Sequence, residues 1–281
     1  MSKQQEIFTN NSKAMLYSMS RREAAQIQLL VHAAKIMNAT LFIDIGANIG
    51  AYTSVMARKS VTERVISFEA SPTTFVELAE NIRLQDLSSV TAHNVALSDQ
   101  KQELEFLERR PLAGANAIAS TANSSHHANS IKSTVECVPL DDVVTVQGES
   151  IIIKLDVEGH ECQVLKGAQS LLTDNDCLLQ VEFLDHGAVE KGESILAAFG
   201  YRRALYLHND FYYLPEENSD LRTDIRDFSF STFSDVLNDY LAMVTYASKI
   251  TRQVRDFKEQ YPDFEDQFPR VNFPRGQSLF N

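Results

Sequence analysis

The sequence predicts an α/β fold, in which helices cover both faces of one open, mostly parallel sheet. Short apolar runs alternate with helical patterns along most of the chain, and this alternation is typical of parallel sheets. Four of the runs end in an acidic residue: Asp44, Glu69, Asp156 and Glu182. Ligands of open α/β sheets bind at the carboxyl ends of the strands, so these residues also indicate where the site lies.

The first half of the chain supplies three strands and three helices. A helix is expected over residues 20–37, where Ser20 and Glu23 form a capping-box pattern before an apolar stripe. Ser71 followed by Pro72 marks the start of another helix. The three strands are expected at 41–46, 64–69 and 89–95, and the other two helices at 49–59 and 72–84.

The second half adds strands at 150–156 and 177–183, with a helix at 160–172 between them. Two aromatic runs, 201–207 and 211–215, are expected to form an antiparallel pair that closes the sheet. Alternation over residues 101–108 predicts one extra strand. Residues 109–134, rich in turn formers, are expected to be a long loop, and such loops are usually functional or disordered.

Composition limits the classes of partner. The chain has 281 residues, with 26 basic and 38 acidic ones, for a net charge of −12 and no long basic block. This balance argues against a nucleic-acid partner. Three dispersed cysteines predict reduced thiols rather than disulfides or a zinc knuckle. With no signal peptide and no membrane-spanning run, we expect a cytoplasmic protein.

The strongest motif is DIGANIG at 44–50. Gly46 lets the chain turn sharply off its strand, and Gly50 opens the next helix toward a ligand. Glu69 lies 19 residues beyond Gly50, at the end of the second strand. A carboxylate at about that distance can accept the hydrogen bonds of a ribose diol. The motif therefore predicts an adenosine-containing ligand.

Two ligands compete for this site. A nicotinamide-dependent oxidoreductase normally shows G-x-G-x-x-G, whereas this chain has Asn48 at the second glycine and Asp44 before the first. S-adenosylmethionine is cationic and has no phosphate, so an acidic rim suits it better. We therefore expect S-adenosylmethionine, with the oxidoreductase as an alternative.

A second motif, IKLDVEGHE at 153–161, places more titratable groups at the mouth of the site. Asp156 ends the strand, Gly159 permits a turn, and His160 and Glu161 begin the next helix. We interpret Asp156 and Glu158 as functional. For His160 and Glu161, a role in helix capping beside solvent is an equally good interpretation.

The motifs together resemble the FkbM family of class I methyltransferases, in order and spacing across roughly residues 41–205. The phrases are DIGANIG, FEASP at 68–72, NVALSD at 94–99, VPLDDV at 138–143, KLDVEGHECQVLKGA at 154–168 and LLQVEF at 178–183. The resemblance implies a Rossmann-like, seven-stranded sheet with an antiparallel closing strand. It also implies S-adenosylmethionine-dependent methylation of a hydroxyl on a sugar, glycoconjugate or natural product. The chain departs from the pattern at Ala70, where the family often has proline.

The resemblance assigns cofactor-binding roles as well. Asp44, Gly46, Asn48 and Gly50 match the glycine-rich loop, and Glu69 matches the ribose-binding acid. The adenine-side loop corresponds to Ala96, Ser98 and Asp99, and the signature after the fourth strand to Asp156, Glu158 and Gly159.

Hydroxyl methylation needs a proton acceptor, for which there are five candidates. These are Asp156, Glu158, His160, Glu182 and His186. A histidine matches neutral pH, whereas a carboxylate needs burial to raise its pKa. In a metal-dependent alternative, Asp156, Glu158 and Glu182 would hold a divalent ion such as magnesium.

The domain boundaries follow from these assignments. We expect an N-terminal helical extension over 1–40, a methyltransferase domain over 41–215 and a C-terminal extension over 216–281. A helix predicted at 234–258 could pack on its own domain or form a homodimer seam. His126 and His127 belong to a solvated loop or to a lid over the acceptor. A non-catalytic scaffold role is the remaining alternative.

Overall fold

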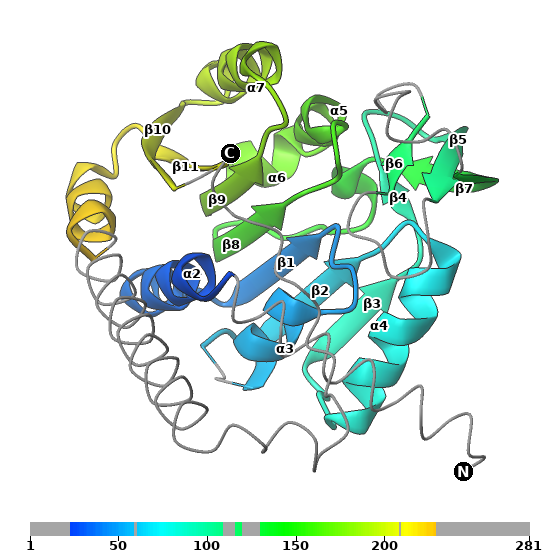
Figure 1. Cartoon of the computed structure of the whole chain (residues 1–281). Coiled ribbons are helices and arrows are strands. Elements are labelled where there is room, and N and C mark those ends of the chain that lie inside the picture. Colours follow the sequence, from blue (N-terminus) through cyan, green and yellow to red (C-terminus); the bar gives the residue numbers. More distant parts are fainter. Residues whose placement is uncertain (1–22, 59–60, 109–115, 120–129, 208, 229–281) are drawn as a thin grey trace, which may run out of the picture. The chain divides into compact units, whose positions relative to one another are not determined.

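The computed structural model describes residues 23–58, 61–108, 116–119, 130–207 and 209–228, all within the first of two units, Met1–Thr232. In these residues seven strands form one sheet in the order β10-β11-β9-β8-β1-β2-β3 (Figure 1). From β9 to β3 neighbouring strands are parallel, whereas β11 runs antiparallel to both β9 and β10. The mostly parallel seven-stranded sheet with an antiparallel closing strand is therefore confirmed. Its strands are β1 (Leu41–Ile45), β2 (Arg64–Phe68), β3 (Val90–His93), β8 (Ser150–Leu155), β9 (Asp176–Glu182), β10 (Tyr201–Leu207) and β11 (Asp210–Pro215).

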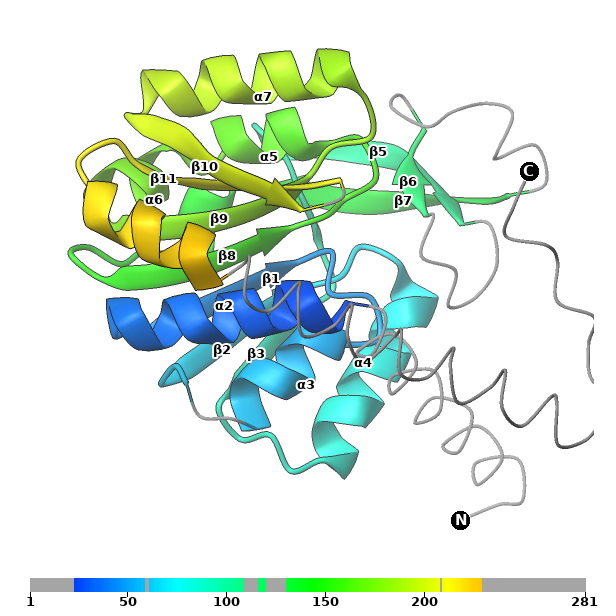
Figure 2. The ribbon, with the colours of Figure 1, turned by 60° about the vertical axis from the view of Figure 1, so that its left-hand side comes forward.

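Helices cover both faces of this sheet. One face carries α2 (Ala24–Met37), α3 (Ala51–Arg58) and α4 (Pro72–Leu84); the other carries α5 (Glu161–Lys166), α6 (Gln169–Asp174) and α7 (His186–Ala198) (Figures 1 and 2). Successive strand residues point to opposite faces. In β1, Phe42 joins the core under α2 and α3, whereas Ile43 joins the core under α5, α6 and α7. The central strands β1 and β8 are mostly apolar because both of their faces are buried.

A second, four-stranded sheet has the order β4-β7-β5-β6. Its strands are β4 (Ala96–Leu97), β5 (Gln102–Glu108), β6 (Ala117–Ile118) and β7 (Ile131–Val138). Figure 2 shows β5, β6 and β7 on the side of the main sheet to which the arrowheads of β8 and β9 point. The extra strand predicted at 101–108 is confirmed. The continuous loop predicted over 109–134 is wrong where β6 and the start of β7 pair with β5. Pairing there buries Phe106, Ile118 and Val135 together.

The helix predictions need three corrections. The single helix expected over 160–172 is two helices, α5 and α6, with Gly167 and Ala168 between them; a Cβ at Gly167 would meet the Ser98 carbonyl oxygen at 2.0 Å. The first helix begins at Ala24, after Glu23, whose side chain makes no capping hydrogen bond. Helix α7 was not predicted at all. By contrast, α4 has the predicted bounds, and the Ser71 hydroxyl accepts from the Thr74 amide at 3.1 Å.

Several predictions fall outside the described residues: Ser20, the two histidines of the 109–134 segment, and the helix at 234–258. No helix among the described residues combines the length and apolar character needed to cross a membrane.

Candidate functional site

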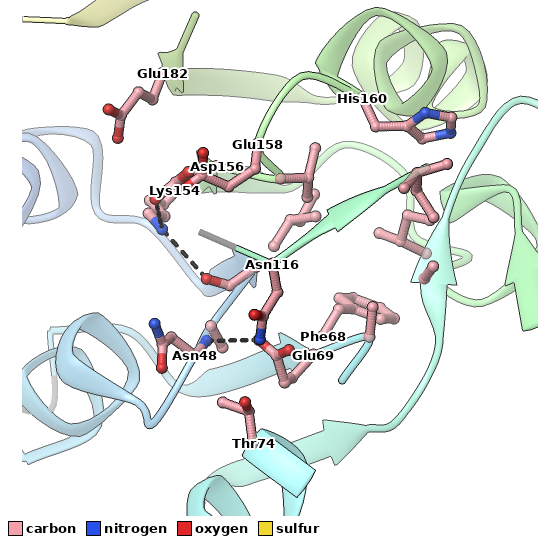
Figure 3. A pocket seen from close by; sticks show the side chains of 18 of the residues that line it. Asn48, Phe68, Glu69, Thr74, Asn116, Lys154, Asp156, Glu158, His160 and Glu182 are labelled. Carbon is pink, nitrogen blue, oxygen red and sulfur yellow. Dashed lines mark hydrogen bonds and ion pairs between the residues drawn. The ribbon is translucent and has the colours of Figure 1, made fainter. Parts of the chain in front are cut away.

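A cavity of about 360 Å³ lies at the carboxyl ends of the main strands. The loops after β1, β2 and β8 and the end of β9 supply one part of its lining, and Phe106, Asn116 and Ile118, on or next to strands of the second sheet, supply another. Figure 3 shows Asn48, Glu69 and Thr74 toward one end, and Lys154, Asp156 and Glu182 toward another. The predicted residues that line it are Gly46, Asn48, Glu69, Ala96, Asp156, Glu158, His160 and Glu182.

Gly46 permits a close approach of three strand ends, those of β1, β2 and β8. Gly46 has φ +78°, and a Cβ there would come within 1.8 Å of the Asp156 carbonyl oxygen. The Gly46 and Ala47 amides both donate to the Phe68 carbonyl, at 3.0 and 2.9 Å. Gly50 has φ +90° and touches Leu78, but it does not line the cavity. Only glycine fits at position 46 without moving β8 away from β1.

Glu69 is held by main-chain amides. Its Oε2 accepts from the Asn48 amide and its Oε1 from the Ser71 amide, each at 2.9 Å. Burial raises the pKa of Glu69 to about 7, while these two hydrogen bonds lower it. Each carboxylate oxygen has about two acceptor sites, so both retain capacity for a diol. Asn48 itself has φ +50°, and its buried Oδ1 has no partner in the described part of the chain.

Asp44 lies beneath the cavity rather than in its wall. It is 1% exposed, and its Oδ2 accepts from the Thr53 amide at 3.0 Å and the Thr53 hydroxyl at 2.6 Å. The same hydroxyl lies 2.7 Å from Ser67 Oγ. Burial raises the pKa of Asp44, and Lys154 and Thr53 oppose this. Asp44 therefore anchors the first turn of α3 and places the β1 loop above it.

Sequence reasoning missed Lys154, the most buried cation of the site. Its Nζ lies 3.0 Å from Asp156 Oδ2, 3.4 Å from the Gly46 carbonyl oxygen and 5.3 Å from the centre of the Tyr52 ring. Burial lowers the pKa of Lys154, but Asp156, Asp44 and Glu23 outweigh it and raise the pKa overall. A lysine inside the apolar run SIIIKL was the available signal, because a lysine is rarely buried without an anionic partner.

Two more carboxylates flank this pair. Glu182, at the end of β9, lines the cavity, and burial, with Asp156 and Asp210 nearby, raises its pKa to about 8. Glu23, just before α2, also lines it, and burial raises its pKa. Glu23 was predicted only as a helix-capping residue; its position in the cavity depends on how α2 packs on the sheet.

His160 lies apart from these acids (Figure 3). Its Nε2 is 2.9 Å from Ser98 Oγ, and that hydroxyl donates to Asp99 at 3.2 Å. Burial lowers the pKa of His160, and Asp99 opposes this. Ala96 lines the cavity, whereas the predicted cofactor residues Ser98 and Asp99 lie behind His160 and support it.

The last two candidates have different positions. Glu161 is buried, and its Oε1 accepts from the Val157 amide at 3.2 Å and the Gly159 amide at 2.9 Å, which fixes the loop after β8. Burial raises its pKa to about 7. His186 is the exposed first residue of α7 and does not line the cavity. The structure therefore does not bring His186 together with the other proposed bases.

The carboxylates do not form a metal centre. Among the described residues, no group of three or more His, Cys, Asp or Glu side chains is arranged to hold a metal ion. Asp156, the central member of the predicted set, is instead paired with the Lys154 ammonium. The arrangement gives no support for magnesium.

Comparison with known families identifies the same region. Residues 44–207, more than half of the chain, match the model of the methyltransferase FkbM domain. The matched span runs from the end of β1 through β10 and contains every predicted site residue.

Individual relatives cover part of the chain. The hexuronic acid methyltransferase AglP of Haloferax volcanii is 31% identical over 156 residues, which are 54% of this chain and 59% of that protein. Methyltransferase 1 of Beauveria bassiana is 25% identical over 59% of this chain and 74% of its own length. A crystal structure of methyltransferase FkbM from Methylobacillus flagellatus aligns with a TM-score of 0.47 and 18% identity, over 63% of this chain and 43% of that one. The chain thus spans about three fifths of the length of the Haloferax relative.

Proposed function

The chain belongs to the FkbM methyltransferase family, and we propose that it transfers a methyl group from S-adenosylmethionine to a hydroxyl oxygen. The proposed acceptor is a sugar, a glycoconjugate or another natural product. One observation carries the proposal: the two ends of a single cavity differ in chemistry. One end offers a carboxylate positioned by main-chain amides, and the other offers several carboxylates around one lysine.

The residues present fit S-adenosylmethionine. Glu69 retains acceptor sites for the ribose hydroxyls, and the unpartnered Asn48 Oδ1 offers a further acceptor beside it. The Lys154 end carries the acidic side chains Glu23, Asp156 and Glu182, which suit a ligand with a cationic amino group and a sulfonium. His160, with Ala96 and Phe106, lines the remaining wall, which we assign to the adenine ring.

When bound, S-adenosylmethionine supplies the methyl group, which leaves the sulfur as the acceptor oxygen bonds to it. The chain holds the acceptor hydroxyl in line and takes its proton. Correct positioning alone can supply several kcal/mol of the barrier reduction. We propose Glu182 as the proton acceptor, because burial raises its pKa to about 8 and makes it a stronger base than an ordinary carboxylate. Asp156 is less suited, because it is paired with Lys154.

The relatives support this assignment over the alternatives. The name of AglP gives a hexuronic acid as the methylated compound, so a related chain already acts on a carbohydrate. The family match favours methyl transfer over a nicotinamide-dependent oxidation or a scaffold role.

Ligand-induced stabilisation tests the proposal. At a hundredfold excess over Kd, S-adenosylmethionine and S-adenosylhomocysteine should each stabilise the protein by about 2.7 kcal/mol, and NAD, NADP and ATP should not. Glu69→Gln puts an amide N–H₂ where an acceptor is needed, so it should weaken binding at least about tenfold. Glu80→Gln is the matched control, because Glu80 is partly exposed and does not line the cavity. Stabilisation by NAD alone, or by none of the five compounds, would contradict the proposal.

A further inference from the structure

A second cavity, of about 210 Å³, adjoins the first beside Lys154. The two share five lining residues: Glu23, Tyr52, Lys154, Asp156 and Glu182. The second cavity adds Gln26, Asn209 and Asp210, which lie on α2, in the turn before β11 and on β11. Because the five shared residues belong to the Lys154 end of the first cavity, a molecule in the second cavity lies next to that end, where we assign the sulfonium.

The wall of this cavity is fixed in place before any ligand binds. Asp210 is 7% exposed; its Oδ1 accepts from Gln180 Nε2 at 2.7 Å and its Oδ2 from Gln26 Nε2 at 3.3 Å. Gln180 Nε2 also donates to the Tyr52 hydroxyl at 3.0 Å. Asp210 pairs with Glu182 in the β9–β11 register, so two carboxylates from different strands face the same space.

An unsatisfied polar atom lies behind the same wall. Gln180 is 1% exposed and directs its amide at two lining residues, yet its Oε1 has no partner in the described part of the chain. A buried acceptor without a hydrogen bond is costly. A hydroxylated ligand in the cavity would offer donors to the carboxylates that line it.

Most of the titratable groups that line this cavity are acids. Four carboxylates line it, from Glu23, Asp156, Glu182 and Asp210, against the single ammonium of Lys154. Lys154 is already paired with Asp156, which leaves three acids without a cation among the lining residues. Burial raises the pKa of each of these three, so further negative charge is unfavourable there.

We propose that the second cavity is the acceptor subsite, and that Glu23 and Asp210 make it select neutral or amino-bearing polyols and reject carboxylated ones. This inference rests on the proposed function, whose acceptor it specifies. It separates this chain from AglP, whose name gives a hexuronic acid as substrate. Donors on a neutral or amino sugar match the acceptors of the wall, whereas a uronate would add a fifth carboxylate.

The test compares three acceptors that differ in one group. The full chain is given S-adenosylmethionine labelled in its methyl group, together with the p-nitrophenyl β-glycoside of glucose, glucosamine or glucuronic acid. We expect labelling of the glucoside or the glucosaminide to exceed that of the glucuronide at least about tenfold. Glu23→Gln and Asp210→Asn should each reduce this ratio about tenfold, and Glu80→Gln, which removes a partly exposed charge that lines neither cavity, should leave it unchanged.

The outcomes separate the two proposals. Equal or faster labelling of the glucuronide, or a ratio that neither variant changes, overturns the selectivity. If no glycoside is labelled although the protein binds S-adenosylmethionine, the polyol acceptor class is wrong while the cofactor assignment stands. If the protein does not bind S-adenosylmethionine, the proposed function itself fails. Two variants on different elements keep the test informative if one of them does not fold.

Discussion

The two ends of the cavity are built in different ways. At the Glu69 end, main-chain geometry makes the site: positive-φ residues turn the loop, and backbone amides hold the carboxylate. At the Lys154 end, side chains make it, and they come from the segment before α2 and from α3, β8, β9 and β11. The first kind of site depends on one short stretch of sequence, the second on how distant elements pack.

The way in which each end is built determines which substitutions it tolerates. Main-chain geometry leaves no room for a larger residue, but it needs few specific side chains. A substitution in a charge network leaves the backbone in place, but removing one charged group leaves its partner buried without an opposite charge. Substitutions at the two ends should therefore differ in their cost and in what they disturb.

The largest loss in the free energy of unfolding is expected at the Glu69 end of the cavity. Gly46→Ala places a methyl group 1.8 Å from the Asp156 carbonyl oxygen, on a backbone with φ +78°. β1 and β8 must separate to accommodate it, so we expect a loss of more than about 4 kcal/mol in the free energy of unfolding. Urea denaturation followed by circular dichroism measures this loss.

Gly200→Ala is the matched control, because Gly200 also has positive φ, +85°, but a Cβ there has no neighbour within 4 Å. It should cost only about 1 kcal/mol, from backbone conformation alone. Similar losses for the two variants would show that conformation, and not the close approach of the strand ends, explains Gly46.

At the Lys154 end, removal of the ammonium group should cause the next largest loss in the free energy of unfolding. Lys154→Met keeps the length of the side chain but leaves Asp156 and buried Asp44 without their ammonium. Removing one member of a buried pair typically costs 3–5 kcal/mol; because Asp156 is partly exposed, we expect about 3 kcal/mol. The free energy of unfolding, measured as for Gly46, checks this value.

Lys132→Met is the corresponding exposed change, since the Lys132 ammonium lies 2.9 Å from Glu105 on the surface. It should cost less than about 1 kcal/mol. If Lys154→Met cost as little in the free energy of unfolding, the acids around Lys154 would not depend on its charge. The Lys154 end of the cavity would then not be a charge network.

The contrast also explains what the sequence could reveal. DIGANIG and Glu69 were recognised because a local motif and a fixed spacing carry their geometry. Glu23 and Asp210 are 187 residues apart (210 − 23) and meet only through the packing of α2 and β11 around Lys154. No pattern along the chain signals such a meeting, so this side of the cavity was only partly predicted.

The fold shows the same division. The main strands were predicted because burial on both faces makes long parts of them apolar, as in residues 151–153. β7 was missed because it is half-exposed, with Ile131 at 61% and Val135 at 5%, so its pattern resembles a polar loop. Between α5 and α6 the Gly167 backbone lies close to that of Ser98, a contact between distant segments that helical periodicity does not encode.

The last effect depends on pH and concerns the loop after β8. Glu161 holds residues 157–159 through two amides, and burial raises its pKa from 4.5 to about 7. The folded state therefore retains a proton that the unfolded state loses above about pH 4.5. This contribution to stability is complete below that pH and is lost as the pH rises through about 7, at most about 3 kcal/mol.

Glu161→Gln isolates the effect, because a glutamine Oε1 can accept the same two amides at every pH. The variant should match wild type in free energy of unfolding at pH 5 and exceed it at pH 8, where the wild-type carboxylate is ionised in a buried site. Glu80→Gln, partly exposed beside Arg83, should show no such pH dependence in this range, because Arg83 lowers the pKa of Glu80. A constant difference between Glu161→Gln and wild type from pH 5 to pH 8 would mean that Glu161 is ionised throughout. An ionised carboxylate, and not a neutral acceptor, would then hold the loop, and the loop would depend on charge as the Lys154 end of the cavity does.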